Sequence, residues 1–211
     1  ESVAKIAGDA EVRGENKTTN VGVNIGSLSA GLNASVNETY LYHGTTVSGS
    51  RHILQGGFNS ERFCKFGGAN GYGPLGRGTY FTDQLPKAGT FTTCGLCGAH
   101  RCMCQTEEGS LIPRVALICK VALGNPQVLT KKSKGVSNSQ APPAGYHSRI
   151  AVGRQEDPTS DFNSNEIAVS NDSQIYPEYL VYYHHYKNLF KPSVWAVEAQ
   201  ASSVDTTNLS V

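Results

Sequence analysis

The sequence predicts an α+β domain in which short strands predominate and helices are few and short. Apolar and β-branched residues occur in short runs that glycine and polar residues separate, which is typical of strands. No stretch keeps a helical period for more than about 12 residues. Glycine makes up 23 of the 211 residues, above the average share of roughly 7%. A chain of 22.5 kDa is long enough to bury the core of one such domain.

The amino-terminal part of the chain is polar. Residues 1–38 are rich in Gly, Asn, Ser and Thr, so we expect a flexible or extended lead-in there. Apolar and small polar residues alternate only over residues 21–25, which would allow a short strand. The chain then becomes aromatic, which predicts a strand at residues 39–43. A short helix is expected at residues 50–55, where a pair of glycines ends it.

The remaining elements follow a glycine-rich loop at residues 59–78. The run VALICKVAL at residues 115–123 predicts a strongly buried strand. Further strands are expected at residues 79–82, 166–169 and 179–186. Residues 124–165 form a long polar stretch, which in a compact domain is usually a functional or mobile loop. We therefore expect one domain at residues 39–197 and a fraying tail at residues 198–211.

Charge and hydropathy exclude several classes of protein. Charged residues make up 17% of the chain and the net charge is +1, which excludes a charge-driven disordered chain. The same balance excludes a basic protein that coats nucleic acid or an anionic membrane. No stretch approaches the roughly 18 apolar residues of a membrane span, and no signal peptide is visible, which favours an intracellular protein of the cytoplasm or nucleus. Five glycosylation sequons leave secretion open, at Asn16, Asn33, Asn37, Asn171 and Asn208.

Four of the six cysteines fall within eleven residues. They are Cys94, Cys97, Cys102 and Cys104, and His100 lies among them. Disulfides of secreted domains tend to staple distant loops, whereas tight clusters of cysteine and histidine are typical of a zinc site. The spacing favours a structural metal site in residues 94–104, with disulfides as the alternative.

A glycine motif of the form G-x-G-x-x-G occupies residues 71–76. In a dinucleotide-binding Rossmann fold this motif joins a strand to a helix whose N-terminus binds pyrophosphate. Here Pro74 interrupts the motif, a loop precedes it and a predicted strand follows it. We exclude the Rossmann interpretation and expect that these glycines permit close approach to a ligand or make a mobile loop.

Three further motifs are weak alone and specific together. They are His43-Gly-Thr, then Gly76-Arg-Gly-Thr-Tyr80-Phe, then Tyr176-Pro-Glu178-Tyr-Leu. Singly, a histidine at a strand end is more often structural, and a glutamate entering a strand is more often a solvent-facing edge residue. In this order, over residues 39–190, they resemble the His-Tyr-Glu triad of the poly(ADP-ribose) polymerase family, a diphtheria-toxin-like ADP-ribosyltransferase. The glutamate motif and the position of the cysteine cluster are most similar to tankyrase members.

The resemblance implies a fold and a reaction. The fold would be two small mixed or antiparallel sheets around an NAD cleft. The reaction would transfer ADP-ribose from NAD to protein acceptors, possibly including this chain, with release of nicotinamide. Breaking that bond builds positive charge on the ribose, which a carboxylate stabilises, so Glu178 is the expected catalytic residue, with His43 and Tyr80. Poly- and mono-transfer both stay open.

The resemblance also implies the residues that bind NAD. Tyr80 and Phe91 would enclose the flat, cationic pyridinium. Gly44 would hold its carboxamide through backbone groups, which requires close approach. His43, with help from Thr45, would bind the adenosine ribose.

Lys87 and Ala88 match further family positions that bind NAD, but Ala88 departs from the family pattern, which usually has serine after this lysine. The missing hydroxyl loses a hydrogen bond worth on the order of 1 kcal/mol, and about tenfold in affinity corresponds to 1.4 kcal/mol. NAD binding is therefore expected to be weaker, unless Thr90 substitutes.

Four of the five Cys and His side chains would bind a structural zinc ion, with His100 as an alternative to one cysteine. The tankyrase pattern would place a histidine where Cys97 stands. Two alternatives to a zinc-containing transferase stay open. One is a catalytically silent module that binds NAD or a partner, and the other is a secreted toxin-like transferase with disulfides in place of zinc.

Overall fold

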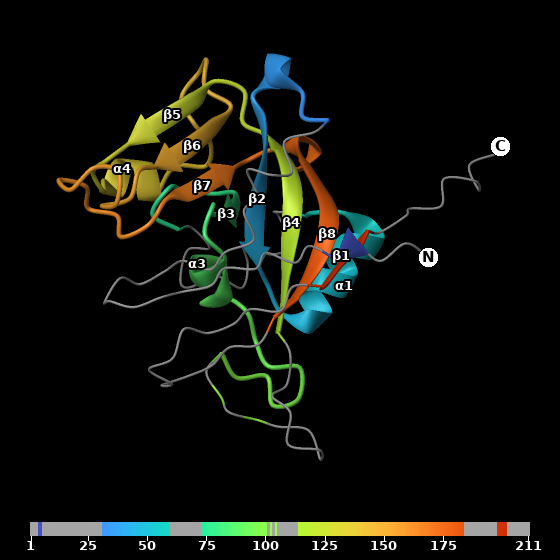
Figure 1. Ribbon diagram of the computed structural model, residues 1–211. Helices are drawn as coiled ribbons and strands as arrows, with labels where there is room; N and C mark the ends of the chain where they lie inside the picture. The colour runs from blue at the N-terminus through green and yellow to red at the C-terminus, as the bar shows by residue number, and fades with distance from the viewer. Residues whose placement is uncertain are drawn as a thin grey trace, which may run out of the picture.

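The computed structural model describes residues 4–5, 31–59, 73–100, 102, 104, 114–183 and 198–201. Over these residues the chain forms two small β-sheets and a few short helices (Figure 1). The strands are β1 (Ala4–Lys5), β2 (Glu38–Gly44), β3 (Thr79–Phe81), β4 (Arg114–Ala122), β5 (Pro126–Leu129), β6 (Ser148–Ala151), β7 (Glu166–Val169), β8 (Ile175–Tyr183) and β9 (Glu198–Ala201). This arrangement confirms the expected α+β fold class.

The five-stranded sheet has the order β1-β9-β8-β4-β2, and each neighbouring pair is antiparallel. β4 is the apolar run predicted as a buried strand, and its side chains build a core on both faces. One apolar cluster, which we call the Leu117 cluster, contains Leu41 and Val121. The other, the Ile118 cluster, contains Tyr40 and Tyr42. Because side chains alternate along a strand, the two clusters lie on opposite faces of this sheet.

The four-stranded sheet has the order β3-β7-β6-β5, in which only β5 and β6 run parallel. Phe81 of β3 and Val169 of β7 belong to the Leu117 cluster. The smaller sheet therefore packs toward that face of the larger one. In Figure 1 it lies beside β2, on the side away from β8.

The described helices are short, as expected. Thr46 caps the N-terminus of α1 (Val47–Gly56), and its hydroxyl accepts from the Gly49 backbone N–H over 2.9 Å. Gly57 caps the C-terminus, and its φ of +74° favours glycine. The others are α3 (Leu85–Gly89), α4 (Lys134–Ser137) and the 3-10 turns η2 (Ala34–Val36) and η3 (Asp172–Gln174).

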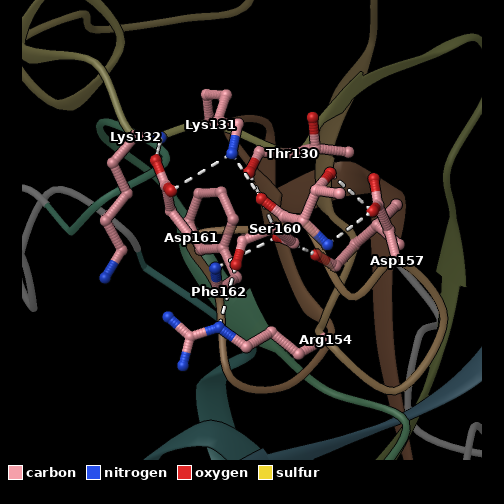
Figure 2. Close-up of polar contacts among 10 residues, drawn as sticks. Thr130, Lys131, Lys132, Arg154, Asp157, Ser160, Asp161 and Phe162 are labelled. Carbon is pink, nitrogen blue, oxygen red and sulfur yellow. Dashed lines mark hydrogen bonds and ion pairs between the residues drawn. The ribbon is translucent and has the colours of Figure 1, made fainter.

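The expectation of a loop over the whole of residues 124–165 is wrong. This stretch contains β5, α4 and β6. Its strands are four residues long, and pairing with neighbours defines them rather than a strong apolar pattern. Part of the stretch is a polar network (Figure 2): Asp161 accepts from the Lys132 backbone N–H over 3.0 Å and pairs with Lys131 over 3.4 Å. The Arg154 side chain donates to the Ser160 carbonyl over 2.9 Å.

The last predicted strand begins earlier than expected, at Ile175 instead of residue 179. The expected short strand at residues 21–25 and residues 60–72 of the glycine-rich loop lie outside the described residues. Among the residues that are described, no helix has the length and apolar character needed to cross a membrane. The domain boundaries at residues 39 and 197 stay predictions.

Candidate active site and metal centre

The end of β2 positions the first motif. His43 points to the same face as the Leu117 cluster, where its ring lies 5.1 Å from Phe58 and 5.5 Å from Phe81, centroid to centroid. His43 Nδ1 lies 2.9 Å from the Tyr80 carbonyl oxygen. Burial lowers the pKa of His43 below its ordinary value of 6.5, so the ring is neutral at pH 7. Because a carbonyl oxygen only accepts, Nδ1 carries the hydrogen and Nε2 is left as an acceptor.

Gly44 follows His43 on the opposite face and contacts α3. A Cβ at this position would lie 1.9 Å from the Ala88 carbonyl oxygen, a separation that real structures do not show. Ala88 is 1% exposed. The absence of a side chain at Gly44 is therefore what lets α3 pack directly on the end of β2. Thr45, the next residue, is partly buried and its hydroxyl lies against the first turn of α1, beside Gly49.

Tyr80 is held by the turn that precedes β3. Its hydroxyl donates to the Gly76 carbonyl over 2.7 Å and accepts from the Leu75 backbone N–H over 2.9 Å. A Cβ on Gly73 would lie 2.5 Å from the Tyr80 hydroxyl, so this glycine allows the turn to wrap around the ring. Arg149, 3% exposed, donates to the Leu75 carbonyl over 2.8 Å and fixes the same turn.

Phe91 lies just after α3 and is 54% exposed. Lys87 Nζ lies 5.4 Å from the centre of its ring and pairs with Glu166 over 2.9 Å. An exposed aromatic face beside a neutralised lysine is available for stacking by a flat ligand. The Thr90 hydroxyl donates to the Lys87 carbonyl over 2.8 Å, so its hydrogen is already used within the helix end.

A β-bulge positions Glu178. Cys119 of β4 pairs with Pro177 and Ile118 pairs with Tyr179, so Glu178 is an extra residue without a partner on β4. Such a bulge redirects a side chain, and Pro177, which lacks an N–H, is tolerated at this kind of position. Glu178 is the fourth residue of β8, which corrects the expectation that it enters the strand.

Two donors bind the same oxygen of Glu178. The Tyr40 hydroxyl donates to Oε2 over 3.0 Å, and Lys120 Nζ lies 3.1 Å from Oε2. The hydrogen bond to Glu178 raises the pKa of Lys120, so this lysine is charged. Burial and the neighbouring carboxylate raise the pKa of Tyr40 far above 10.0, so its hydroxyl stays a donor. The Glu178 side chain is 23% exposed and reachable from solvent.

The structure thus brings together His43 with Tyr80, Gly44 with Ala88, and Lys87 with Phe91. Glu178 shares its sheet face with Tyr40 and the Ile118 cluster, whereas the His43 ring extends from the other face. Sequence reasoning missed the partners of these residues. They are Tyr40, Lys120, Arg149 and Glu166. Alternation along residues 39–43 could have placed Tyr40 beside Tyr42; no sequence signal points to the others.

The sulfur atoms of Cys94, Cys97, Cys102 and Cys104 all lie within 4.8 Å of one another. All five cysteines in the described part of the chain are free thiols, which disfavours disulfides in this loop. Hydrogen bonds with Cys97 and then Cys102 raise the pKa of Cys104 to about 12. Four converging sulfurs are a donor set that zinc prefers.

His100 lies apart from these four sulfurs. Its Nδ1 is 3.1 Å from the Thr92 carbonyl oxygen. The described residues therefore group four cysteines, without the histidine, into one potential metal centre.

A comparison with known protein families defines the class of protein. The poly(ADP-ribose) polymerase catalytic domain matches residues 17–185, more than half of the chain. The chain belongs to this family, and its two-sheet architecture agrees with the family fold.

Proposed function

We propose that this chain is an active, tankyrase-like ADP-ribosyltransferase that uses NAD and modifies protein acceptors, itself among them. The observation that carries the proposal is the bulge that turns Glu178 toward Tyr40 and Lys120. A carboxylate fixed before the reaction stabilises a developing cation without reorganisation. Membership of the family supports NAD as the substrate.

The reaction breaks the bond between ribose C1′ and the nicotinamide nitrogen, and nicotinamide leaves with the electron pair. A nucleophilic atom of the acceptor bonds to C1′, and its proton passes to a base. Tyr40 and Lys120 both bind Oε2 of Glu178, so we expect Oε1 to accept from the ribose 2′-hydroxyl. The negative charge next to C1′ then lowers the barrier because it attracts the transition state more than the ground state.

The other residues of the site bind NAD. Nε2 of His43, an acceptor in the neutral ring, suits a ribose hydroxyl. The exposed face of Phe91 suits the pyridinium, with Tyr80 on its other side and Gly44 against the carboxamide. Ala88 offers no hydroxyl, and the Thr90 hydroxyl already donates to the Lys87 carbonyl. We therefore expect weaker NAD binding than serine at position 88 would give.

The metal in this proposal is one structural zinc ion held by four cysteines. Thiolates of Cys94, Cys97, Cys102 and Cys104 would fill all four positions. A closed site of this kind supplies stability to the fold and leaves no position for substrate. His100 is left out of the ligand set in this proposal because the four sulfur atoms already converge without it.

One alternative has support of its own: an NAD-binding module without turnover. The ion pair with Lys120 partly neutralises Glu178, and Ala88 removes an expected contact. Binding without nicotinamide release would be its signature.

The test is incubation with NAD labelled on the adenylate part, comparing wild type with Glu178→Gln and with Asp161→Asn as a control. Asp161 also pairs with a lysine but lies in the network of Figure 2. We expect labelled protein with wild type and Asp161→Asn, and a loss of about a hundredfold or more with Glu178→Gln. A ladder of products would indicate polymer. NAD binding without nicotinamide release in wild type would overturn the enzyme in favour of the binding module.

A further inference from the structure

Arg114, the first residue of β4, is a buried cation directed at the cysteine cluster. It is 3% exposed. One of its terminal nitrogens, Nη1, donates to the Thr92 carbonyl over 2.9 Å, and Nη2 lies 3.6 Å from Cys102 Sγ, within hydrogen-bonding distance for sulfur. The guanidinium therefore connects the cluster to the segment that follows α3.

The charge of Arg114 lacks a carboxylate partner among the residues that the structure describes. The ion pairs of this part of the chain involve Lys87, Lys120 and Lys131. A buried charge is strongly unfavourable unless an opposite charge or several strong hydrogen bonds compensate it. Arg114 has one carbonyl oxygen and one sulfur as partners. Four neutral thiols would not compensate a guanidinium.

A metal-loaded cluster would compensate it. Four thiolates carry four negative charges, and a divalent ion leaves a net charge of −2 on the complex. A hydrogen bond from a cation to a thiolate is charge-assisted and therefore stronger than a neutral one. The position and the charge of Arg114 both match such a complex.

We propose that Arg114 is the counterion of a four-cysteine metal centre and ties that centre to the site. The link runs through Thr92, whose carbonyl accepts from Arg114 and whose hydroxyl donates to the Gly89 carbonyl at the end of α3 over 3.0 Å. Phe91 lies between Gly89 and Thr92 in the sequence. The inference rests on the metal in the proposed function and not on transferase activity.

The test compares Arg114→Met with Arg149→Met. Arg149 is an equally buried arginine, 3% exposed, that binds carbonyl oxygens instead of sulfur. Zinc content, zinc affinity by competition with a coloured chelator, and thermal unfolding with and without chelator are measured for each. Cobalt substitution reports the thiolate ligands by their charge-transfer absorption.

We expect one zinc per wild-type chain and a loss of about 10- to 100-fold in zinc affinity for Arg114→Met, as for other partners of metal ligands. Arg149→Met should keep wild-type affinity. With metal, Arg114→Met should melt below wild type. Without metal, it should melt at or above wild type, because the uncompensated charge is gone. Arg114→Lys should recover part of the affinity.

Several results would overturn this inference. Wild-type zinc affinity in Arg114→Met would refute the counterion, and an equal drop in melting temperature with and without metal would reduce Arg114 to a packing role. A wild-type chain that binds no zinc or cobalt would refute the metal centre itself, while nicotinamide release would still test the transferase separately. If Arg114→Met does not fold, Arg114→Gln replaces it, since glutamine keeps a donor for Thr92 without the charge.

Discussion

Replacing Tyr40 by phenylalanine removes one hydroxyl and keeps the ring in the Ile118 cluster. The lost hydrogen bond, 3.0 Å to Glu178 Oε2, comes from a residue that is 5% exposed. Hydrogen bonds to charged groups contribute roughly 1.5–3 kcal/mol. At about 1.4 kcal/mol for each factor of ten, a contact that holds Glu178 in the transition state predicts a decrease in kcat of about 10- to 100-fold. Tyr40 hydrogen-bonds to Glu178, whose contact with the ribose is expected to strengthen in the transition state, so kcat should change more than KM.

The assay is steady-state nicotinamide release, with Tyr42→Phe as the matched control. Tyr42 is 1% exposed and lies on the same strand and the same face, whereas the hydrogen bond to Glu178 Oε2 comes from the Tyr40 hydroxyl. We expect wild-type kcat for Tyr42→Phe. Since burial and Glu178 raise the pKa of Tyr40, its hydroxyl keeps its proton throughout the neutral range, and the loss should not vary with pH there.

Two results would refute this reasoning. Unchanged kcat in Tyr40→Phe would mean that the hydroxyl does not position the carboxylate during the reaction. An equal loss in Tyr42→Phe would mean that the effect is a general response of the core to a missing hydroxyl. Urea unfolding of both variants separates loss of fold from loss of positioning.

Two further predictions concern β2. The unfolded chain binds a proton at His43 near pH 6.5 whereas the folded chain does not, so the free energy of unfolding falls as the pH decreases below 6.5. Urea unfolding at several pH values should show a shallower fall for His43→Gln than for wild type, and an unchanged fall for His52→Gln, an exposed control on α1. Equal slopes for wild type and both variants would contradict this prediction. Gly44→Ala would place a Cβ against the Ala88 carbonyl and should destabilise the fold by roughly 1–3 kcal/mol, weakening NAD binding. Gly56→Ala, where a Cβ meets open space, should not lower the melting temperature, and equal melting temperatures for both variants would oppose the predicted contact.

Local patterns predicted β2, β4 and β8 of the larger sheet and β3 and β7 of the smaller one. β1 and β9 lie in the stretches that were expected to be a lead-in and a fraying tail. Residues 115–123 predict β4 because an apolar run in which Lys120 is the only charged residue suits a strand that is buried on both faces. β5 and β6 were missed for the opposite reason. Sequences such as PQVL and SRIA carry little apolar signal, and their extended conformation depends on pairing with each other and with β7. Where the local strand preference is weak, contacts between distant segments therefore determine the backbone conformation.

In the candidate site, too, local motifs predict some features and long-range pairing determines the others. The motifs around His43, Tyr80 and Glu178 identify residues because a reaction needs particular side chains in order. They do not identify supporting contacts: the bulge at Glu178 depends on the register between β4 and β8, and Lys120 lies 58 positions earlier in the chain. Strand alternation along residues 39–43 places Tyr40 on the same face as Tyr42, but its position opposite Lys120 follows from the pairing of β2 with β4.

The charges around Phe91 and Glu178 suit the proposed reaction as a set. A pyridinium that stacks on Phe91 would meet Lys87, whose ammonium lies 5.4 Å from the ring centre, and two cations would repel each other. Glu166, 2.9 Å from that ammonium, neutralises it, so the aromatic face stays favourable to a cationic ring. When the glycosidic bond breaks, positive charge moves from the ring to the ribose, and under the proposed function it moves toward Glu178. Glu166 would then act on binding of the cationic ring, whereas Glu178 would act most strongly on the chemical step, so Glu178→Gln is expected to lower kcat more than it raises KM.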